Sequence, residues 1–288
     1  MINRHNITRD ILSELEIINK RFLKNKIKLP KRIKKGLSVN LNSYKDTPLE
    51  MGLFSIINSK HITDISEYLK SYIDLGISHL QREFCLESSL KIEISNEEFV
   101  IESSTSKIGI NLFDWWKLFN VALILRDDKF KNELYDLFSN CKEETKDPFW
   151  RKSMMLVLMC NDKEEFETSI LSDIKSIVKS GVVEYHSLQG GGLIKSKEGK
   201  GKREKMWFPV MELYYLAYLH DENAFNTLLE EYLIFKKKWI IENKEEDNSN
   251  YWIDFPLLAC CSYAHDKSIS ISVESEYIPS FIFKREVT

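Results

Sequence analysis

The sequence has no apolar run near the ~18 residues that a membrane-spanning helix requires. Its first residues, MINRHNITRDILSEL, are polar and indicate a capped helix, which excludes a secretory signal peptide. Five cysteines are present, but the number is odd and no C-x-x-C pair occurs. This excludes a disulfide framework and favours buried thiols in a reducing compartment. We therefore expect a cytoplasmic protein with no membrane partner.

Motifs of catalysis and cofactor binding are also absent. Between Met206 and Phe283 there is no nucleophile elbow, and no histidine and carboxylate pair stands at metal-binding spacing on one predicted helix. A phosphate-binding loop is excluded because neither Gly199-Lys200 nor Gly201-Lys202 has a glycine five positions earlier or a hydroxyl residue after the lysine. We expect no catalytic residue, no cofactor and no metal, and we predict that the protein is not an enzyme.

The composition is that of an ordinary globular protein. The 288 residues are 43% hydrophobic and 30% charged, and the net charge of −3 lacks the strong positive balance of most nucleic-acid-binding proteins. A nucleic-acid partner is therefore not expected from the composition.

One stretch departs from this balance. Lys20 to Lys35 contains nine lysine or arginine residues and no acid. The stretch predicts either a patch that contacts phosphates or a solvated surface around Pro30. The solvated surface is favoured because Phe22 is the only aromatic residue there, so bases have little to stack on. A helical regulator that binds nucleic acid through this patch stays as the alternative function.

Hydrophobic periodicity predicts mostly helices. A first helix, capped by Thr8, places Ile11 and Ile18 on one face, and a second runs from Ile65 to Leu80 after a turn-rich link around Thr47 and Pro48. Residues 89–104 change to a period of two around the turn SNEE, which predicts a β-hairpin.

A loose repeat follows. In each of four units an aromatic pair begins an apolar helix and an aspartate stands where the chain turns, so that its side chain can accept hydrogen bonds from the next helix. The pairs are Trp115-Trp116, Phe149-Trp150, Trp207-Phe208 and Tyr251-Trp252, and the aspartates are Asp127, Asp162, Asp221 and Asp266. The expected fold is mainly α, with stacked antiparallel helix hairpins, a small β-hairpin and a C-terminal strand over Ser268 to Ser275.

We expect one domain, residues 1–288, with a flexible basic loop at about 187–205. The loop is rich in glycine and lysine, and the helical pattern resumes after it. In the helix after Asp221, Phe225 and Tyr232 share the apolar side, whereas Lys236 is assigned to the polar side.

Two His-Asp dipeptides, His220-Asp221 and His265-Asp266, indicate a further alternative, a metal-dependent phosphohydrolase, because such pairs can bridge metal ions. The aspartate recurs in every unit of the repeat and the histidine does not. Helix capping therefore explains the pattern better than metal ligation.

A few polar residues near the C-terminus are candidates for binding a partner. Glu212 interrupts an apolar helix, where an ionised side chain needs a partner or a wet cleft. Glu212, Asp254, Glu274 and Glu276 form either internal ion pairs or an acidic contact surface, and Tyr277 either packs the tail onto the body or anchors an interface.

Three segments resemble the immunity protein 49 family, whose members neutralise bacterial polymorphic toxins. They begin at WWKLFNVALILRDDKF, at FPVMELYYLAYLHDENAF and at WIDFPLLACCSYAHDKSISISVESEYIPSF, and the last is the most specific. The matching residues are Trp116, Ala122, Arg126, Asp127, Glu212, Asp221, Phe225, Asn226, Ala259, Asp266, Glu274, Ser275, Tyr277 and Pro279.

This resemblance implies a helical protein without catalytic activity that binds and occludes a cognate toxin, encoded by a neighbouring gene. The Gly- and Lys-rich loop and the first ~60 residues depart from the family pattern. Neither the toxin nor the oligomeric state follows from the resemblance.

Overall fold

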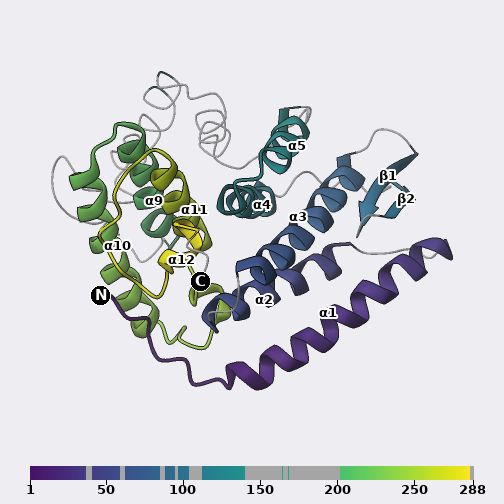
Figure 1. The fold of residues 1–288 in the computed structure, drawn as a ribbon, viewed down its shortest axis with the longest axis horizontal. Helices are drawn as coiled ribbons and strands as arrows, with labels where there is room; N and C mark the ends of the chain where they lie inside the picture. The colour runs from purple at the N-terminus through teal and green to yellow at the C-terminus, as the bar shows by residue number, and fades with distance from the viewer. Residues whose placement is uncertain are drawn as a thin grey trace. The chain divides into compact units, whose positions relative to one another are not determined.

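The structure is a computed structural model of the whole chain, and it describes residues 1–36, 41–58, 62–84, 88–94, 97–103, 112–139, 164, 168 and 202–285 (Figure 1). The chain divides into two compact units. The C-terminal unit consists of Met1–Thr8 and Pro148–Glu286, and the N-terminal unit contains Arg9–Asp147. That the chain forms a single domain stays a prediction.

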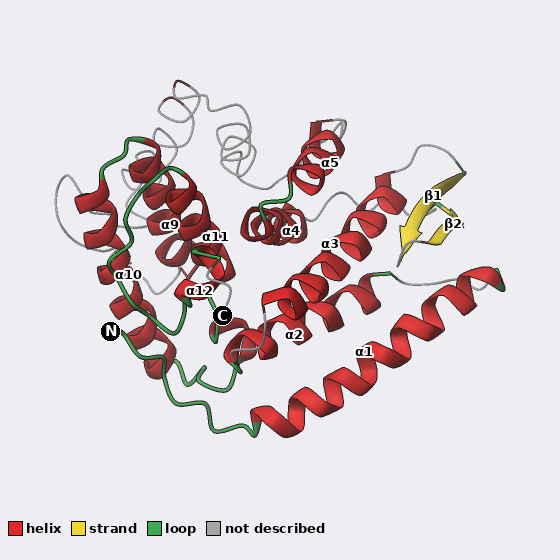
Figure 2. Cartoon of the chain, in the orientation of Figure 1, coloured by secondary structure: helices red, strands yellow, loops and turns green. Residues whose placement is uncertain are grey.

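The described part of the N-terminal unit is built from helices and one hairpin (Figure 2). Its helix α3 packs against α2, α4 and α5, and α1 packs against α2. The helices are α1 (Ile11–Lys34), α2 (Asn42–Ile57), α3 (Ile62–Phe84), α4 (Leu112–Leu125) and α5 (Asp128–Ser139). The mainly helical prediction is confirmed.

The predicted β-hairpin is also confirmed. Strands β1 (Ser89–Ile94) and β2 (Glu97–Glu102) are antiparallel, with Ile92 opposite Phe99. Both of these side chains are buried in a cluster with Leu29 and Ile33 of α1. The inward side chains of the hairpin therefore cover the end of α1, which explains the alternation in the sequence.

Two local predictions in the N-terminal unit were wrong. Thr47 and Pro48 lie inside α2 rather than in a link, and the buried side chains of this helix are too widely distributed to give a clear amphipathic period. Helix α1 is capped by Asp10 instead of Thr8, because the Asp10 carboxylate accepts the backbone N–H of Ser13 at 3.2 Å.

The described part of the C-terminal unit is centred on α9, which packs against α10 and α11, while α12 packs on α11. These helices are α9 (Lys202–Tyr218), α10 (Glu222–Glu242), α11 (Phe255–Asp266) and α12 (Ser280–Phe283). Residues 187–201 of the predicted basic loop lie outside the described residues, and its last four positions begin α9.

Four helices end in the same way. Arg126, His220, Lys244 and Ser268 each have a positive φ, between 54° and 64°, just after α4, α9, α10 and α11. After each of them the next N–H bonds back to a helical carbonyl, as Asp221 does to Leu216 at 3.0 Å. This is the Schellman arrangement, usually made with glycine.

The aspartate of the repeat caps the next helix in two units. Asp127 accepts the N–H of Phe130 at 3.3 Å, and Asp221 accepts that of Ala224 at 3.0 Å. The unit that begins at Phe149 lies outside the described residues. In the last unit Asp266 is the final residue of α11, so it does not cap a following helix.

The predicted strand at Ser268 to Ser275 was wrong. Only Ser275 forms a β-bridge, to Ile2, and no strand of the described hairpin pairs with this segment. Instead, α10 provides polar side chains: Glu222 accepts the Ser270 N–H and Asn226 accepts the Ser272 N–H, each at 2.9 Å. The alternation in the sequence therefore marks an extended segment bound to a helix.

The two His-Asp dipeptides should respond oppositely to glycine. His220→Gly should stabilise the protein by about 1 kcal/mol, because glycine adopts a positive φ without strain. His265→Gly should cost about 1 kcal/mol, because His265 lies within α11. Chemical denaturation of both variants measures this contrast, and destabilisation by His220→Gly would contradict the capping role.

Candidate functional site

All five residues predicted to bind a partner lie in the C-terminal unit, at two depths. Glu212, Asp254 and Tyr277 are buried, with exposed fractions of 7%, 6% and 0%. Glu274 and Glu276 are exposed. The structure thus separates three buried residues from an exposed pair. The members of that pair, Glu274 and Glu276, are two positions apart in the sequence.

Asp254 forms an ion pair inside the C-terminal unit. Its Oδ2 lies 2.6 Å from the Lys236 Nζ, and both side chains are nearly inaccessible. The same oxygen accepts the Tyr232 hydroxyl at 3.3 Å, while Oδ1 accepts the Leu257 N–H at 3.0 Å and so caps α11. These three bonds compensate for the loss of water around the carboxylate.

Tyr277 joins this ion pair to the first residues of the chain. The Lys236 Nζ lies 5.2 Å from the centre of the Tyr277 ring, and the Tyr277 carbonyl accepts the Asp254 N–H at 3.0 Å. The Tyr277 hydroxyl lies 2.9 Å from the His5 Nδ1. We call Tyr232, Lys236, Asp254, Tyr277 and His5 the buried ionic cluster.

The contacts of the His5 ring assign the tautomer of its neutral form. Its Nε2 lies 2.8 Å from the Glu246 carbonyl, which can only accept, so Nε2 carries a proton. Nδ1 then accepts the Tyr277 hydroxyl proton. Burial, the largest cause, lowers the pKa of His5, and the nearby Arg4 lowers it further, against the raising effect of the Glu246 carbonyl. The neutral ring is thereby favoured.

Burial also raises the pKa values of the tyrosines of the cluster. The pKa of Tyr277 is about 12, chiefly because of burial. That of Tyr232 is raised by burial first and by the neighbouring Asp254 carboxylate second. Both hydroxyls therefore stay protonated and act as donors in neutral solution.

The N-terminal segment, residues 1–8, holds the exposed acidic pair in place. The Ile2 N–H donates to the Glu274 carbonyl at 2.8 Å, and the Arg4 N–H donates to the Glu276 carboxylate at 2.7 Å. Thr8 donates twice to Asp247, at 3.0 Å from its N–H and 2.6 Å from its hydroxyl. The backbone that carries Glu274 and Glu276 is thus bonded on one side to this segment.

Sequence reasoning missed two members of the cluster. Lys236 was assigned to the polar side of α10, although it lies four residues after Tyr232 and eleven after Phe225, on the same buried stripe. His5 had no local signal, because its partners lie over 240 residues away.

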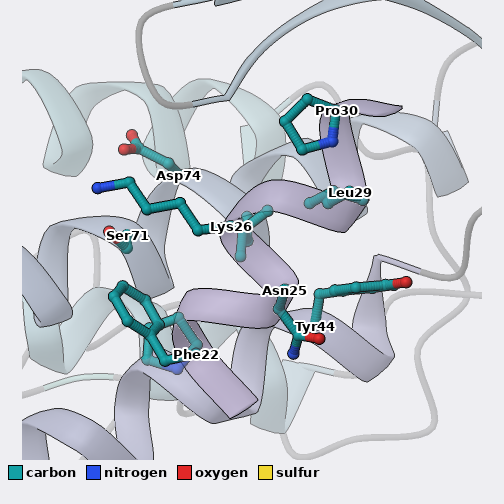
Figure 3. Close-up of a pocket in the computed structure, with 10 residues that line it drawn as sticks. Phe22, Asn25, Lys26, Leu29, Pro30, Tyr44, Ser71 and Asp74 are labelled. Atoms are coloured by element: carbon teal, nitrogen blue, oxygen red, sulfur yellow. The ribbon is translucent and has the colours of Figure 1, made fainter. Parts of the chain in front are cut away.

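A second candidate surface lies in the N-terminal unit, where all nine basic residues of the Lys20 to Lys35 stretch are exposed, eight of them on α1 and Lys35 as its C-cap. A cavity of about 60 Å³ lies between α1, α2 and α3, space for on the order of four water molecules. Figure 3 shows Phe22 and Leu29 beside it, with Lys26 and Asp74 reaching toward the same side. This volume is too small for a typical organic substrate.

Two further features bear on the alternatives. Among the described residues, no three His, Cys, Asp or Glu side chains come close enough together to hold a metal ion. Across the same residues, no helix combines the length and apolarity needed to cross a membrane.

Comparison with known proteins identifies a family match. A family model described as Immunity protein 49 matches residues 75–282, well over half of the chain. The matched range starts within α3 and ends within α12. No curated protein and no solved structure matches the chain.

Breaking the Lys236–Asp254 pair should be strongly destabilising. Lys236→Met leaves the Asp254 carboxylate buried without its cation, at a cost of roughly 3–5 kcal/mol. Lys236→Met combined with Asp254→Asn should recover much of this, because asparagine can still cap α11. Urea denaturation measures each variant. Lys238→Met, on the exposed side of α10, is the matched control and should change stability by less than about 0.5 kcal/mol.

The His5 contacts should make stability depend on pH. Because the pKa of His5 is lower in the folded state, the unfolded chain takes up its proton first, and the stabilisation is lost as pH falls below about 6.5. The free energy of unfolding of the wild type minus that of His5→Gln should therefore shrink between pH 7 and pH 5. The difference also cancels the contribution of His79, whose pKa is lowered by burial. A difference that stays constant would contradict a neutral His5 ring with a lowered pKa in the folded state.

Proposed function

The chain belongs to the immunity protein 49 family, and we propose on this basis that it binds a cognate bacterial toxin and neutralises it by occlusion, without catalysis. The toxin is part of a polymorphic toxin system and is encoded by a neighbouring gene. The encounter takes place in the bacterial cytoplasm, before the toxin reaches its target.

The family match over residues 75–282 is the observation that carries this proposal. All five candidate contact residues fall within that range, as do four of the five members of the buried ionic cluster, with His5 outside it. The match supports a shared role for the C-terminal unit and leaves the identity of the toxin to experiment.

In our proposal Glu274 and Glu276 contact the toxin directly, because their side chains are exposed. They would face a basic surface of the toxin, where complementary charge speeds association and helps to select the partner. Both residues are already bonded to the N-terminal segment, Glu274 through its backbone carbonyl to Ile2 and Glu276 through its carboxylate to the Arg4 N–H. Less ordering would then be needed on binding.

The buried residues have a different place in this proposal. Asp254 and Tyr277 hold the segment beneath the acidic pair, through the Lys236 ion pair and the His5 hydrogen bond. Direct contacts from Glu212, Asp254 or Tyr277 to the toxin would require these side chains to become exposed. We assign them to positioning the contact surface.

Co-expression tests the function itself. The C-terminal toxin domain of the neighbouring gene is expressed with and without this protein, and cell survival is scored together with co-purification. Survival with a stable complex is the expected result. An inactive toxin variant serves as the control for binding without toxicity. Loss of viability despite normal levels of folded protein would overturn the proposal.

Charge reversal at the acidic pair tests the contact surface. Glu274→Lys should weaken toxin binding about tenfold, mainly through slower association, and reduce its dependence on salt. Glu230→Lys, an equal charge change at an exposed position of α10, is the matched control and should bind normally. Biolayer interferometry at two salt concentrations measures the association rate and the affinity of both variants. Equal binding by the two variants would place the contact surface elsewhere.

A further inference from the structure

The outward face of α1 carries large aliphatic side chains that the protein does not bury. Ile17, Leu23 and Ile27 have exposed fractions of 56%, 51% and 58%. The opposite face of the helix buries Ile18, Leu29 and others, so α1 is already anchored to its unit. The exposed aliphatics are thus additional to those needed for folding.

Lysines stand next to these aliphatic residues on the same face. Lys20 and Lys24 precede Leu23 and Ile27 by three residues each, and Lys31 follows Ile27 by four, spacings that bring side chains together on a helix. We call Ile17, Lys20, Leu23, Lys24, Ile27 and Lys31 the outer stripe of α1. Figure 1 draws α1 along the outside of its unit, with α2 and α3 on one side of it.

The positive charge of this region is only partly balanced by the described residues. Arg21 lies 3.5 Å from Glu50 and Lys34 lies 2.7 Å from Glu97, and both pairs are exposed. For the three lysines of the outer stripe, no carboxylate of the described residues lies within 4.0 Å. The acidic residues of α1, Glu14 and Glu16, lie before the stripe.

The shape of the outer stripe and its residue types favour an anionic lipid surface over nucleic acid as its partner. The cavity beside α1 lies on its inner side, against α2 and α3, so the stripe offers protruding side chains rather than a groove. Nucleic-acid binding gains little from Leu and Ile, and the only aromatic residue in the stretch, Phe22, packs edge-on against Tyr68 at 5.3 Å. A fluid anionic lipid surface accepts both the aliphatic side chains and the lysines.

We propose that the outer stripe of α1 binds an anionic membrane surface, with the helix lying in the interface. Leu23 and Ile27 enter the boundary between headgroups and acyl chains, while Lys20, Lys24 and Lys31 extend along them to reach lipid phosphates. Such a helix lies on the bilayer and does not cross it, so no spanning segment is needed. The sequence alone predicted no membrane partner, and this inference goes beyond it.

This surface is separate from the proposed toxin contact. Helix α1 ends at Lys34, before the range matched by the family, and the acidic pair lies in the other unit. Variants of the outer stripe should therefore leave toxin neutralisation intact in the co-expression assay. Failure of membrane binding and failure of immunity are thus distinguishable.

Vesicle sedimentation with the purified full chain tests the inference. Wild-type protein should sediment with vesicles of phosphatidylcholine and phosphatidylglycerol (3:1, an arbitrary test composition) at about 0.1 M salt, and bind pure phosphatidylcholine at least about tenfold more weakly. Lys20→Glu with Lys24→Glu and Lys31→Glu should lower binding by about a hundredfold. Leu23→Ser with Ile27→Ser should weaken it several-fold and leave a residual binding that salt abolishes.

A matched triple variant controls for net charge. Lys70→Glu, Lys238→Glu and Lys284→Glu change three exposed lysines on other elements and should bind vesicles almost as the wild type does. An equal loss in this control would overturn the role of the stripe, and so would absence of wild-type binding at low salt. Salt-sensitive binding to duplex DNA or RNA without binding to vesicles would favour the nucleic-acid alternative instead. If the variant with three lysines of the outer stripe changed to glutamate fails to fold, the variant with Leu23→Ser and Ile27→Ser still tests the inference.

Discussion

The buried Lys236 ammonium is the constraint on which the arrangement of the C-terminal unit depends. A lysine with an exposed fraction of 2% requires a carboxylate, and Asp254 provides it while also capping α11. One carboxylate therefore fixes the start of one helix against the middle of another. The Tyr277 ring covers the same ammonium, so the C-terminal segment is drawn to this point as well.

The N-terminal segment adds a layer to that arrangement. As the neutral tautomer with its proton on Nε2, His5 donates to the Glu246 carbonyl and accepts from the Tyr277 hydroxyl. The segment donates the Ile2 N–H to the backbone carbonyl of Glu274 and the Arg4 N–H to the carboxylate of Glu276. The buried ionic cluster and the exposed acidic pair are consequently linked through the N-terminal segment, although the residues concerned lie at opposite ends of the sequence.

Features set by local chemistry could be predicted from the sequence. The alternation around Ile92 and Phe99 predicts the hairpin because each strand buries one face, and Asp127 and Asp221 cap helices through bonds only three residues long. The mainly α class follows from such patterns, whereas the family is indicated by the resemblance of three sequence segments. At Pro48 the same approach failed, because tertiary burial of α2 overrides the usual signal of a proline.

The candidate site was harder to predict because its chemistry is not local. Asp254 and Tyr277 stood out in the sequence, but the partners that accompany their burial, Lys236 and His5, are brought near only by the fold. The extended segment after Ser268 shows the same limit. Its period of two was visible, whereas the helix side chains of Glu222 and Asn226 that replace a partner strand were not.

The family match begins in the middle of α3, and this boundary bears on how functions are divided along the chain. Helix α1 lies wholly before it, yet its inner face buries Leu29 and Ile33 against the hairpin that lies within the matched range. Packing on that inner side therefore ties α1 to the shared fold. The outer stripe does not take part in this packing. Exposed aliphatic residues beside lysines on that face are typical of a separate binding surface.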